Sequence, residues 1–178
     1  MTRLYTRSGD RGETGLADGS RRRKDDARIQ ALGSVDECNA HLGVLLAQFA
    51  PDDPLLTLLA PVQHRLFDLG ATLAGAPATL AASDIDALER DIDDLCAALP
   101  PLRQFVLPGG STAAALAQVA RAVCRRAERD LVAAATAESL PPELGRYLNR
   151  LADLLFAVAR TLAARAGGDV VWQPRNAR

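Results

Sequence analysis

The sequence predicts an all-α protein, a single domain folded as an up-and-down bundle of five helices that follows an N-terminal loop. The chain has 178 residues, which suits one domain with one hydrophobic core. Hydrophobic residues make up 48% of the chain but aromatic residues only 4%, so Leu, Ala and Val must fill the core. Isoleucine occurs only at Ile29, Ile85 and Ile92, and alternating runs of Val, Ile, Thr and Tyr are missing. An all-β fold is therefore excluded.

The predicted domain spans residues 1–178 and has three parts. Residues 1–23 are rich in Gly, Arg and Asp and lack a lasting period, so we expect an ordered loop there. Residues 24–168 carry the helical pattern, and residues 169–178 form a C-terminal tail. No internal repeat or second domain is visible.

The first two helices are predicted from apolar residues that recur every three or four positions. Helix one should run from about 25 to 50, with Asp25 or Asp26 as its N-cap. The APDDP segment breaks the pattern. It resumes from Leu55 to Leu73 despite Pro61, which should kink the second helix or restart it.

Three further helices follow the same rhythm. Ser83 and Asp86 have the spacing of a capping box at the start of the third helix, which the Pro100–Pro101 pair ends. Ser111 or Thr112 should cap a long fourth helix that reaches about residue 138. The fifth helix begins near the prolines at 141 and 142 and ends near the glycines at 167 and 168. Five such stripes are most simply buried in an up-and-down bundle.

The charge balance excludes several partners. With 21 basic and 22 acidic residues the formal charge is −1, which argues against nucleic-acid or anionic-membrane binding by net charge. No uninterrupted apolar stretch is long enough to span a membrane, and the N-terminal residues lack the apolar region of a signal peptide. We therefore expect a cytoplasmic protein with no nucleic-acid or membrane partner.

The predicted fourth helix carries a dense cluster of guanidinium groups. Arg121, Arg125 and Glu128 follow at helical spacing, with Arg126 and Arg129 beside them. Guanidinium groups match phosphate oxygens, so this face is a candidate polyphosphate site. A solvated face with intrahelical ion pairs is the alternative that this charge pattern leaves open.

Polar residues flank the apolar stripes of two other helices. Asp36 in the first helix is either a partner for an arginine of the fourth helix or an exposed acid. Asn149 in the fifth helix is equally ambiguous.

The N-terminal loop is a second candidate for anion binding. Gly9, Gly12 and Gly15 allow successive backbone N–H groups to face an anion, and Thr6, Ser8 and Thr14 add hydroxyl donors. The loop is not a Walker A motif, because GxxxxGK[ST] is absent. Lys24 is the only lysine in the chain, which suggests a specific role for its ammonium group.

Taken together, five motifs resemble one family in their order and spacing. The sequence resembles the PduO-type ATP:cob(I)alamin adenosyltransferases over about residues 2–172. The motifs are YTRSGDRGETGL, KDDARIQALGSVDECNAHLG, RQFVLPGG, ARAVCRRAER and YLNRLADLLFAVAR. The resemblance implies transfer of the 5′-deoxyadenosyl group of ATP to the cobalt of cob(I)alamin, which gives adenosylcobalamin and tripolyphosphate. It also implies a homotrimer with active sites between subunits.

The resemblance further implies roles for individual residues. Asp36 and Arg121 match an ion pair between adjacent subunits that supports the corrinoid site, and Phe105 matches the aromatic residue below the corrin. Mg²⁺ is expected to be bound mainly through the ATP phosphates. The residues that match ATP contacts are Thr6, Arg7, Ser8, Gly9, Asp10, Gly12, Thr14, Gly15, Lys24, Arg125, Arg126, Ala127, Glu128, Arg129 and Asn149.

Two readings compete with a simple enzyme. A noncatalytic helical protein on the same bundle would sense a nucleotide or carry a corrinoid. An enzyme that also delivers its product to an adenosylcobalamin-dependent mutase, or works with a reductase, would have the same sequence features.

Overall fold

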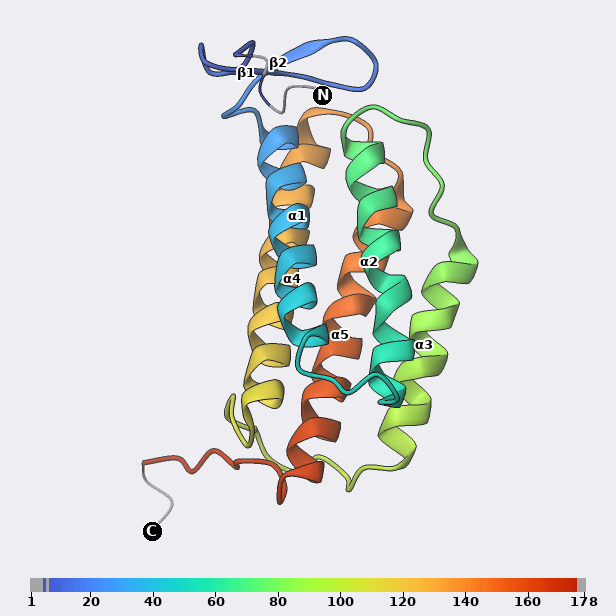
Figure 1. The fold of residues 1–178 in the computed structure, drawn as a ribbon, viewed down its shortest axis with the longest axis vertical. Helices are drawn as coiled ribbons and strands as arrows, with labels where there is room; N and C mark the ends of the chain where they lie inside the picture. Colours follow the sequence, from blue (N-terminus) through green and yellow to red (C-terminus); the bar gives the residue numbers. More distant parts are fainter. Residues whose placement is uncertain (1–4, 6, 176–178) are drawn as a thin grey trace.

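The computed structural model describes Tyr5 and residues 7–175. Within them the chain forms a short β-hairpin and five helices (Figure 1). The elements are β1 (Glu13–Gly15), β2 (Arg21–Arg23), α1 (Ala27–Leu46), α2 (Pro54–Leu73), α3 (Ala82–Ala97), α4 (Thr112–Ala137) and α5 (Pro142–Arg165). The prediction of an all-α, five-helix bundle is confirmed.

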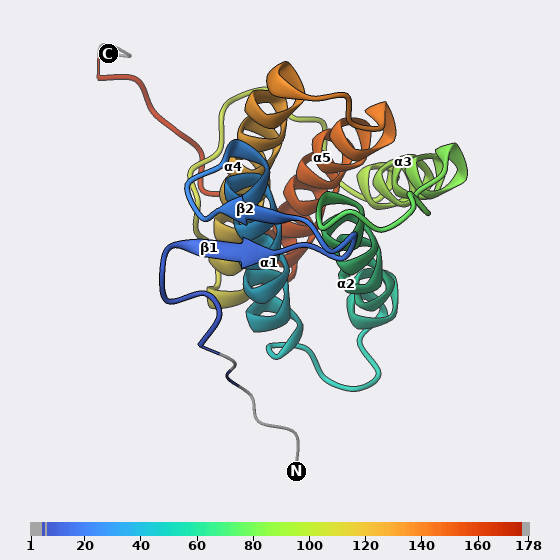
Figure 2. The same cartoon turned by 90° about the horizontal axis from the view of Figure 1, so that it is seen from above.

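Consecutive helices run in opposite directions, as predicted, but their spatial order differs from their order in the sequence. α1 lies between α2 and α4, α5 packs on the other side of α4, and α3 packs against the outer side of α5 (Figure 2). The 98–111 connection between α3 and α4 crosses the end of the bundle opposite the hairpin (Figure 1). The two ends of the bundle thus carry different loops.

Leucine and alanine fill the core, as the composition predicts. α5 contributes Leu144, Leu148, Leu151, Leu154 and Leu155, all fully buried. α4 instead contributes small residues, which let its backbone come close to α1 and α5. Its buried alanines are Ala114, Ala117, Ala120, Ala127 and Ala134.

Side-chain caps fix where most helices begin. Asp26 accepts the Arg28 N–H at 2.9 Å, Asp53 accepts the Leu55 N–H at 2.9 Å, and Ser111 accepts the Ala114 N–H at 3.1 Å. These contacts confirm the predicted caps of the first and fourth helices. The first helix is shorter than predicted, because its regular hydrogen bonding ends at Leu46.

One predicted cap is wrong, and one of the two effects expected of Pro61 does not occur. The Ser83–Asp86 capping box does not form, because the N-cap of α3 is Ala81, two residues before Ser83, and Asp84 accepts the Ala81 N–H at 2.9 Å. α2 continues as one helix through Pro61, so of the two expected effects, a kink or a restart, the restart does not occur. A proline removes one backbone donor, and the apolar residues on either side of it still pack on the core.

The N-terminal segment contains strands that the sequence did not predict. β1 pairs antiparallel with β2, and Glu13, Thr14 and Gly15 lie opposite Arg23, Arg22 and Arg21. Gly12 and Gly19 have φ angles of +81° and +82°, a conformation that favours glycine. Three-residue strands are too short to show the alternation by which strands are recognised, so the segment resembled a loop.

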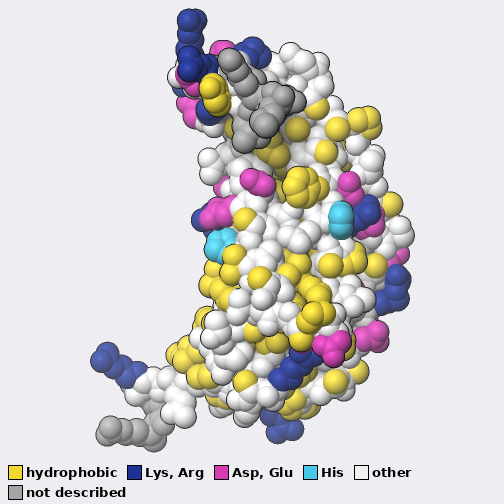
Figure 3. All heavy atoms as spheres, in the orientation of Figure 1, with side chains coloured by type: hydrophobic (Ala, Val, Ile, Leu, Met, Phe, Trp, Pro, Cys, Tyr) yellow, Lys and Arg dark blue, Asp and Glu magenta, His cyan; other side chains and the backbone are white. Residues whose placement is uncertain are grey.

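The surface is uneven in character. Figure 3 shows Lys and Arg side chains at the hairpin end and again near the opposite end, with hydrophobic side chains exposed along the face between them. Phe67 of α2 is 70% exposed. No helix in the described part of the chain has the length and apolar character needed to cross a membrane.

Candidate active site

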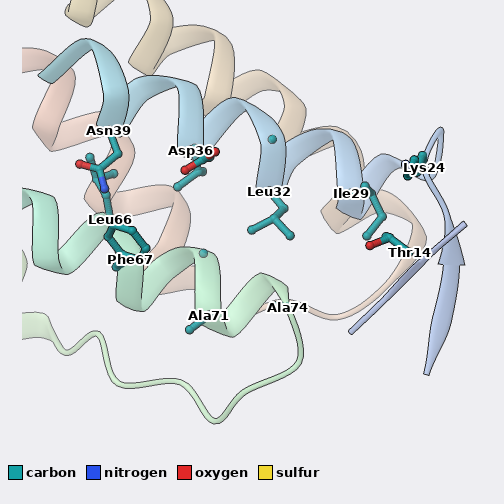
Figure 4. Close-up of a pocket in the computed structure, with 13 residues that line it drawn as sticks. Thr14, Lys24, Ile29, Leu32, Asp36, Asn39, Leu66, Phe67, Ala71 and Ala74 are labelled. Carbon is teal, nitrogen blue, oxygen red and sulfur yellow. The ribbon is translucent and has the colours of Figure 1, made fainter. Parts of the chain in front are cut away.

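A cavity of about 580 Å³ lies between α1 and α2, directly below the hairpin (Figure 4). Its walls are mostly apolar, and its polar groups lie at Thr14 and Lys24 near the hairpin and at Asp36 and Asn39 further along α1. The apolar residues that line it are Ile29, Leu32, Val35, Leu66, Phe67, Ala71 and Ala74. The α1–α2 groove, as we call it, is therefore an apolar slot with a cation at one end.

The glycine-bearing turn before β1 lies against Lys24. A Cβ atom on Gly9 would come within 3.3 Å of Lys24 Nζ and 3.3 Å of the Glu13 carbonyl oxygen, so glycine allows this close approach. The turn is tied down by backbone bonds from the Gly12 N–H to the Gly9 oxygen at 3.2 Å and from the Lys24 N–H to the Gly12 oxygen at 2.8 Å. The Gly9 turn and the Lys24 ammonium group are thus held next to each other.

The other residues of the predicted loop site surround the Gly9 turn and Lys24. Ser8 contributes its backbone oxygen to a 2.8 Å hydrogen bond from Arg21 Nη2, and Arg7 adopts a left-handed φ of 60°. Asp10 is exposed, and its N–H donates to the Arg7 oxygen at 3.4 Å. Gly15 ends β1. Thr6 lies outside the described residues.

A salt-bridge cluster anchors the hairpin to the bundle. Glu138, just after α4, accepts from Arg22 Nη2 of β2 at 3.2 Å and from Arg28 Nη1 of α1 at 2.9 Å. Arg28 Nε also donates to the Leu73 oxygen at the end of α2 at 2.6 Å. The sequence motifs do not reveal Glu138 and Arg28 as positioning residues, because their partners are more than 40 residues away in the sequence.

The arginines of α4 divide between two neighbouring helices. Arg126 forms an ion pair with Glu37 of α1, whereas Arg121 lies over the Phe156 ring of α5, with 5.7 Å from its guanidinium carbon to the ring centroid. Partial burial lowers the pKa of Arg121, and the neighbouring positive charge of Arg125 lowers it further. Arg125 itself is exposed.

The remaining predicted residues of α4 and α5 form part of the same surface. Asn149 Nδ2 donates to Glu128 Oε1 at 2.9 Å, which joins the two motifs across the helix pair. Arg129 Nη1 donates to the Arg125 oxygen at 3.2 Å, and Ala127 is buried beneath them. We call the exposed surface of Arg121, Arg125, Glu128 and Asn149 the arginine face.

The α1–α2 groove and the arginine face lie on different sides of one chain. Viewed from above, α1 and α2 form one side of the bundle and α4 and α5 the other (Figure 2). Asp36 lines the groove, whereas Arg121 packs on Phe156, and no ion pair joins Asp36 to Arg121 among the described residues. One chain alone does not bring the two halves of the predicted site together.

Phe105 lies at the end of the bundle opposite the hairpin, in the 98–111 connection. Its side chain is 78% exposed and meets Trp172 edge to face, with 6.2 Å between the ring centroids. The Trp172 N–H donates to the Phe105 oxygen at 2.8 Å. Sequence analysis placed Trp172 in a tail, and the structure joins it to the predicted corrinoid residue.

The fold and these surfaces define a helical-bundle protein with an apolar groove and an arginine-rich face. The chain belongs to the cobalamin adenosyltransferase family, whose model matches residues 4–162.

Individual relatives agree. The chain is 47% identical over 175 residues to a cobalamin adenosyltransferase of Cupriavidus metallidurans, covering 97% of this chain and 95% of that protein. It is 46% identical to a corrinoid adenosyltransferase of Mycobacterium tuberculosis, covering 100% and 96% of the two chains.

Solved structures show the same fold. A variant PduO-type ATP:corrinoid adenosyltransferase from Lactobacillus reuteri, complexed with cobalamin and ATP, superposes with a TM-score of 0.92 at 30% identity, covering 97% of this chain and 100% of that one. A second variant from the same organism, complexed with ATP, superposes with a TM-score of 0.90 at 31% identity. The match covers 96% of this chain and 100% of that one.

Proposed function

We propose that the chain transfers the 5′-deoxyadenosyl group of ATP to the cobalt of a cob(I)alamin-type corrinoid. The electron pair of cobalt(I) forms the new bond to C5′ of the ribose, the bond from C5′ to the phosphate oxygen breaks, and tripolyphosphate leaves with that electron pair. The products are adenosylcobalamin and tripolyphosphate. The chain's relatives are named for this activity, and Lactobacillus reuteri relatives have been solved with its substrates.

The observation that carries the proposal is the position of Lys24. Its ammonium group lies against the Gly9 turn at the end of an apolar groove, where a phosphate chain would meet a cation and the corrinoid an apolar wall. The corrinoid supplies a strong nucleophile, so the protein needs to place two substrates and stabilise the departing charge. No general base is required.

The triphosphate would be held by the hairpin and the arginine face together. Lys24 and the exposed Arg125 provide charged donors that do not need to be displaced from buried ion pairs, and they stabilise negative charge as it develops on the leaving oxygen. The residues of the N-terminal segment proposed to contact the nucleotide are Thr6, Arg7, Ser8, Gly9, Asp10, Gly12, Thr14, Gly15 and Lys24. Those of α4 and α5 are Arg125, Arg126, Ala127, Glu128, Arg129 and Asn149.

Mg²⁺ would enter with the nucleotide. In the described part of the chain no three His, Cys, Asp or Glu side chains gather closely enough to hold a metal ion. The proposed nucleotide contacts are chiefly N–H donors and cations, which bind phosphate oxygens. They are suited to a nucleotide whose phosphates provide most of the Mg²⁺ ligands.

A homotrimer would complete the site. The groove of one subunit and the arginine face of the next must meet, because the two surfaces lie on different sides of a single chain (Figure 2). Asp36 in the groove would then pair with Arg121 of the neighbouring subunit. Repeating this heterologous contact around a closed ring gives equivalent sites at every interface.

The corrinoid would lie between the hairpin end and the Phe105 end of the bundle. Phe105 is exposed and apolar, so it can occupy the space below the macrocycle and exclude water and the lower axial ligand. A reductase that supplies cobalt(I) and a mutase that uses the product are the proposed protein partners, and the cytoplasm is the proposed location.

An anaerobic assay tests the function. The purified chain is mixed with ATP, Mg²⁺ and chemically reduced cob(I)alamin, and the Co(I) absorbance is followed. We expect this absorbance to fall as a light-sensitive product and tripolyphosphate appear in equal amounts. A chain that binds both substrates but yields neither product would be a carrier or a sensor and would contradict the proposal.

A further inference from the structure

Arg160 is a buried charge that the proposed reaction does not use. It lies in α5 and is 7% exposed. Its Nε donates to Asp169 Oδ2 at 3.0 Å, and its Nη2 donates to the Pro100 oxygen at 2.8 Å. One guanidinium group therefore holds two segments that are 69 residues apart in the sequence.

These two segments carry the exposed aromatic pair. Pro100 lies in the connection that presents Phe105, and Asp169 begins the segment that presents Trp172. The segments pair through an antiparallel bridge between Val106 and Val171. The Leu107 N–H donates to the Val170 oxygen at 2.7 Å, which extends this pairing.

The backbone at the end of the connection is also tailored to lie against α5. Gly110 has a φ of +91°, and a Cβ there would come within 3.1 Å of the Ala163 Cβ. A larger residue would push the connection away from the helix. Arg160 at one end and Gly110 at the other thus hold the Phe105 connection on α5.

The α5 surface that carries Arg160 is continuous with the arginine face. Asn149, Phe156 and Arg160 are separated by seven and four residues, so they lie along one side of the helix. Asn149 contacts Glu128, and Phe156 lies under Arg121. The same side of α5 therefore supports the proposed nucleotide residues and the Phe105 connection.

We infer that Arg160 is a positioning residue for the corrinoid half of the site, acting through Pro100 and Asp169 to hold Phe105 and Trp172 in place. This inference rests on the proposed function. A buried ion pair adds little net stability compared with a well-packed apolar residue, so the geometry it imposes is the better reason for its presence here. Residues 169–172 are then part of the site.

The single tryptophan of the chain makes the inference measurable. Trp172 is the only tryptophan, so fluorescence excited at wavelengths that tyrosine does not absorb reports on this segment alone. In Arg160→Met we expect acrylamide to quench Trp172 more strongly, because the segment is released. We also expect kcat/KM for cob(I)alamin to fall about 10- to 100-fold, while the KM for ATP stays within about twofold.

Three further variants separate positioning from folding. Arg165→Met is the matched control, since Arg165 is an exposed residue of the same helix that pairs with Asp53 at 2.8 Å. It should leave both readouts unchanged. Arg160→Lys should give intermediate values, because one ammonium group cannot match both contacts of the guanidinium fork. Asp169→Asn weakens the contact without removing a large side chain and serves if Arg160→Met does not fold.

Each outcome decides between the alternatives. Stronger quenching of Trp172 with unchanged corrinoid kinetics would overturn the positioning role. An equal loss of kcat/KM for ATP and for cob(I)alamin would overturn it too. Unchanged quenching in folded Arg160→Met or Asp169→Asn would show that Arg160 does not hold the segment. A wild-type chain without turnover would instead contradict the proposed function, and the quenching comparison would still show whether Arg160 holds residues 169–172.

Discussion

Two adjacent arginines of α4 have different surroundings. Arg126 is paired with Glu37 of α1 within the same chain, whereas Arg125 is exposed and has its guanidinium group available to a ligand. A phosphate would have to compete with Glu37 for Arg126 but not with a carboxylate of this kind for Arg125. We therefore propose Arg125, not Arg126, as the main phosphate contact.

Replacing Arg125 should weaken ATP binding without unfolding the protein. Hydrogen bonds to charged groups contribute about 1.5–3 kcal/mol each, so we expect Arg125→Ala to raise the Kd for ATP roughly 10- to 100-fold. Isothermal titration calorimetry measures the Kd. Arg146→Ala, which removes an exposed arginine of α5 outside the proposed site, is the control. Normal ATP affinity in Arg125→Ala would refute its phosphate role.

At the scale of the elements, the hairpin depends on contacts with the helices. Its two strands have three residues each, which is too short for independent stability. Glu138 joins β2 to α1, and Arg28 continues the link to the end of α2. The Gly9 turn and Lys24 are therefore held in position by a residue at the C-terminal end of α4.

Loss of this anchor should change the KM for ATP more than the overall stability of the fold. In Glu138→Gln the charged hydrogen bonds to Arg22 and Arg28 are weakened, so we expect the KM for ATP to rise about fivefold, a cost of about 1 kcal/mol. The melting temperature should change by only a few degrees. Glu89→Gln, which weakens the exposed pair with Arg150, provides the comparison. Equal KM values in both variants would rule out the anchor.

The cap of α1 gives a prediction with a defined pH dependence. The Arg28 backbone N–H, with help from the Arg22 side chain, holds the pKa of Asp26 below its usual range despite opposing burial. A depressed carboxyl pKa stabilises the fold at neutral pH, and this stabilisation is lost as the pH falls through the folded-state pKa.

We expect Asp26→Ala to lower the free energy of unfolding by about 1 kcal/mol at pH 7. The difference from wild type should shrink as the pH falls below about 4, near the ordinary carboxyl pKa. Urea titrations at several pH values measure it. Asp26→Asn retains a side-chain cap, so its free energy of unfolding at neutral pH should fall less than that of Asp26→Ala. A difference that grows on acidification would have the wrong sign.

At the scale of the whole molecule, the sequence predicted what burial dictates and missed what long-range packing decides. The Leu and Ala periods identified five helices because each stripe must face a core. The α4 cluster was visible because its members lie within two helical turns. The Glu138 anchor and the Arg160 contacts were invisible, because their partners meet only after the helices pack. For the same reason, the sequence did not predict on which side of the bundle each motif lies.

The placement of the motifs also determines how many chains a site needs. Lys24 lines the α1–α2 groove, whereas Arg125 is an exposed residue of α4 and does not line it. Seen from above, α4 and α5 lie on the other side of the bundle from α1 and α2 (Figure 2). If one triphosphate contacts both residues, they must come from different subunits. We therefore propose that each active site takes its hairpin from one chain and its arginine face from the next.

Mixed oligomers of two inactive variants test this claim most directly. Lys24→Ala and Arg125→Ala chains are co-expressed with different tags and purified through both, and adenosyl transfer is measured per trimer. Every mixed trimer then contains one interface with both intact halves, so we expect about one third of wild-type turnover. Mixed trimers no more active than the parent variants would contradict a site shared between subunits.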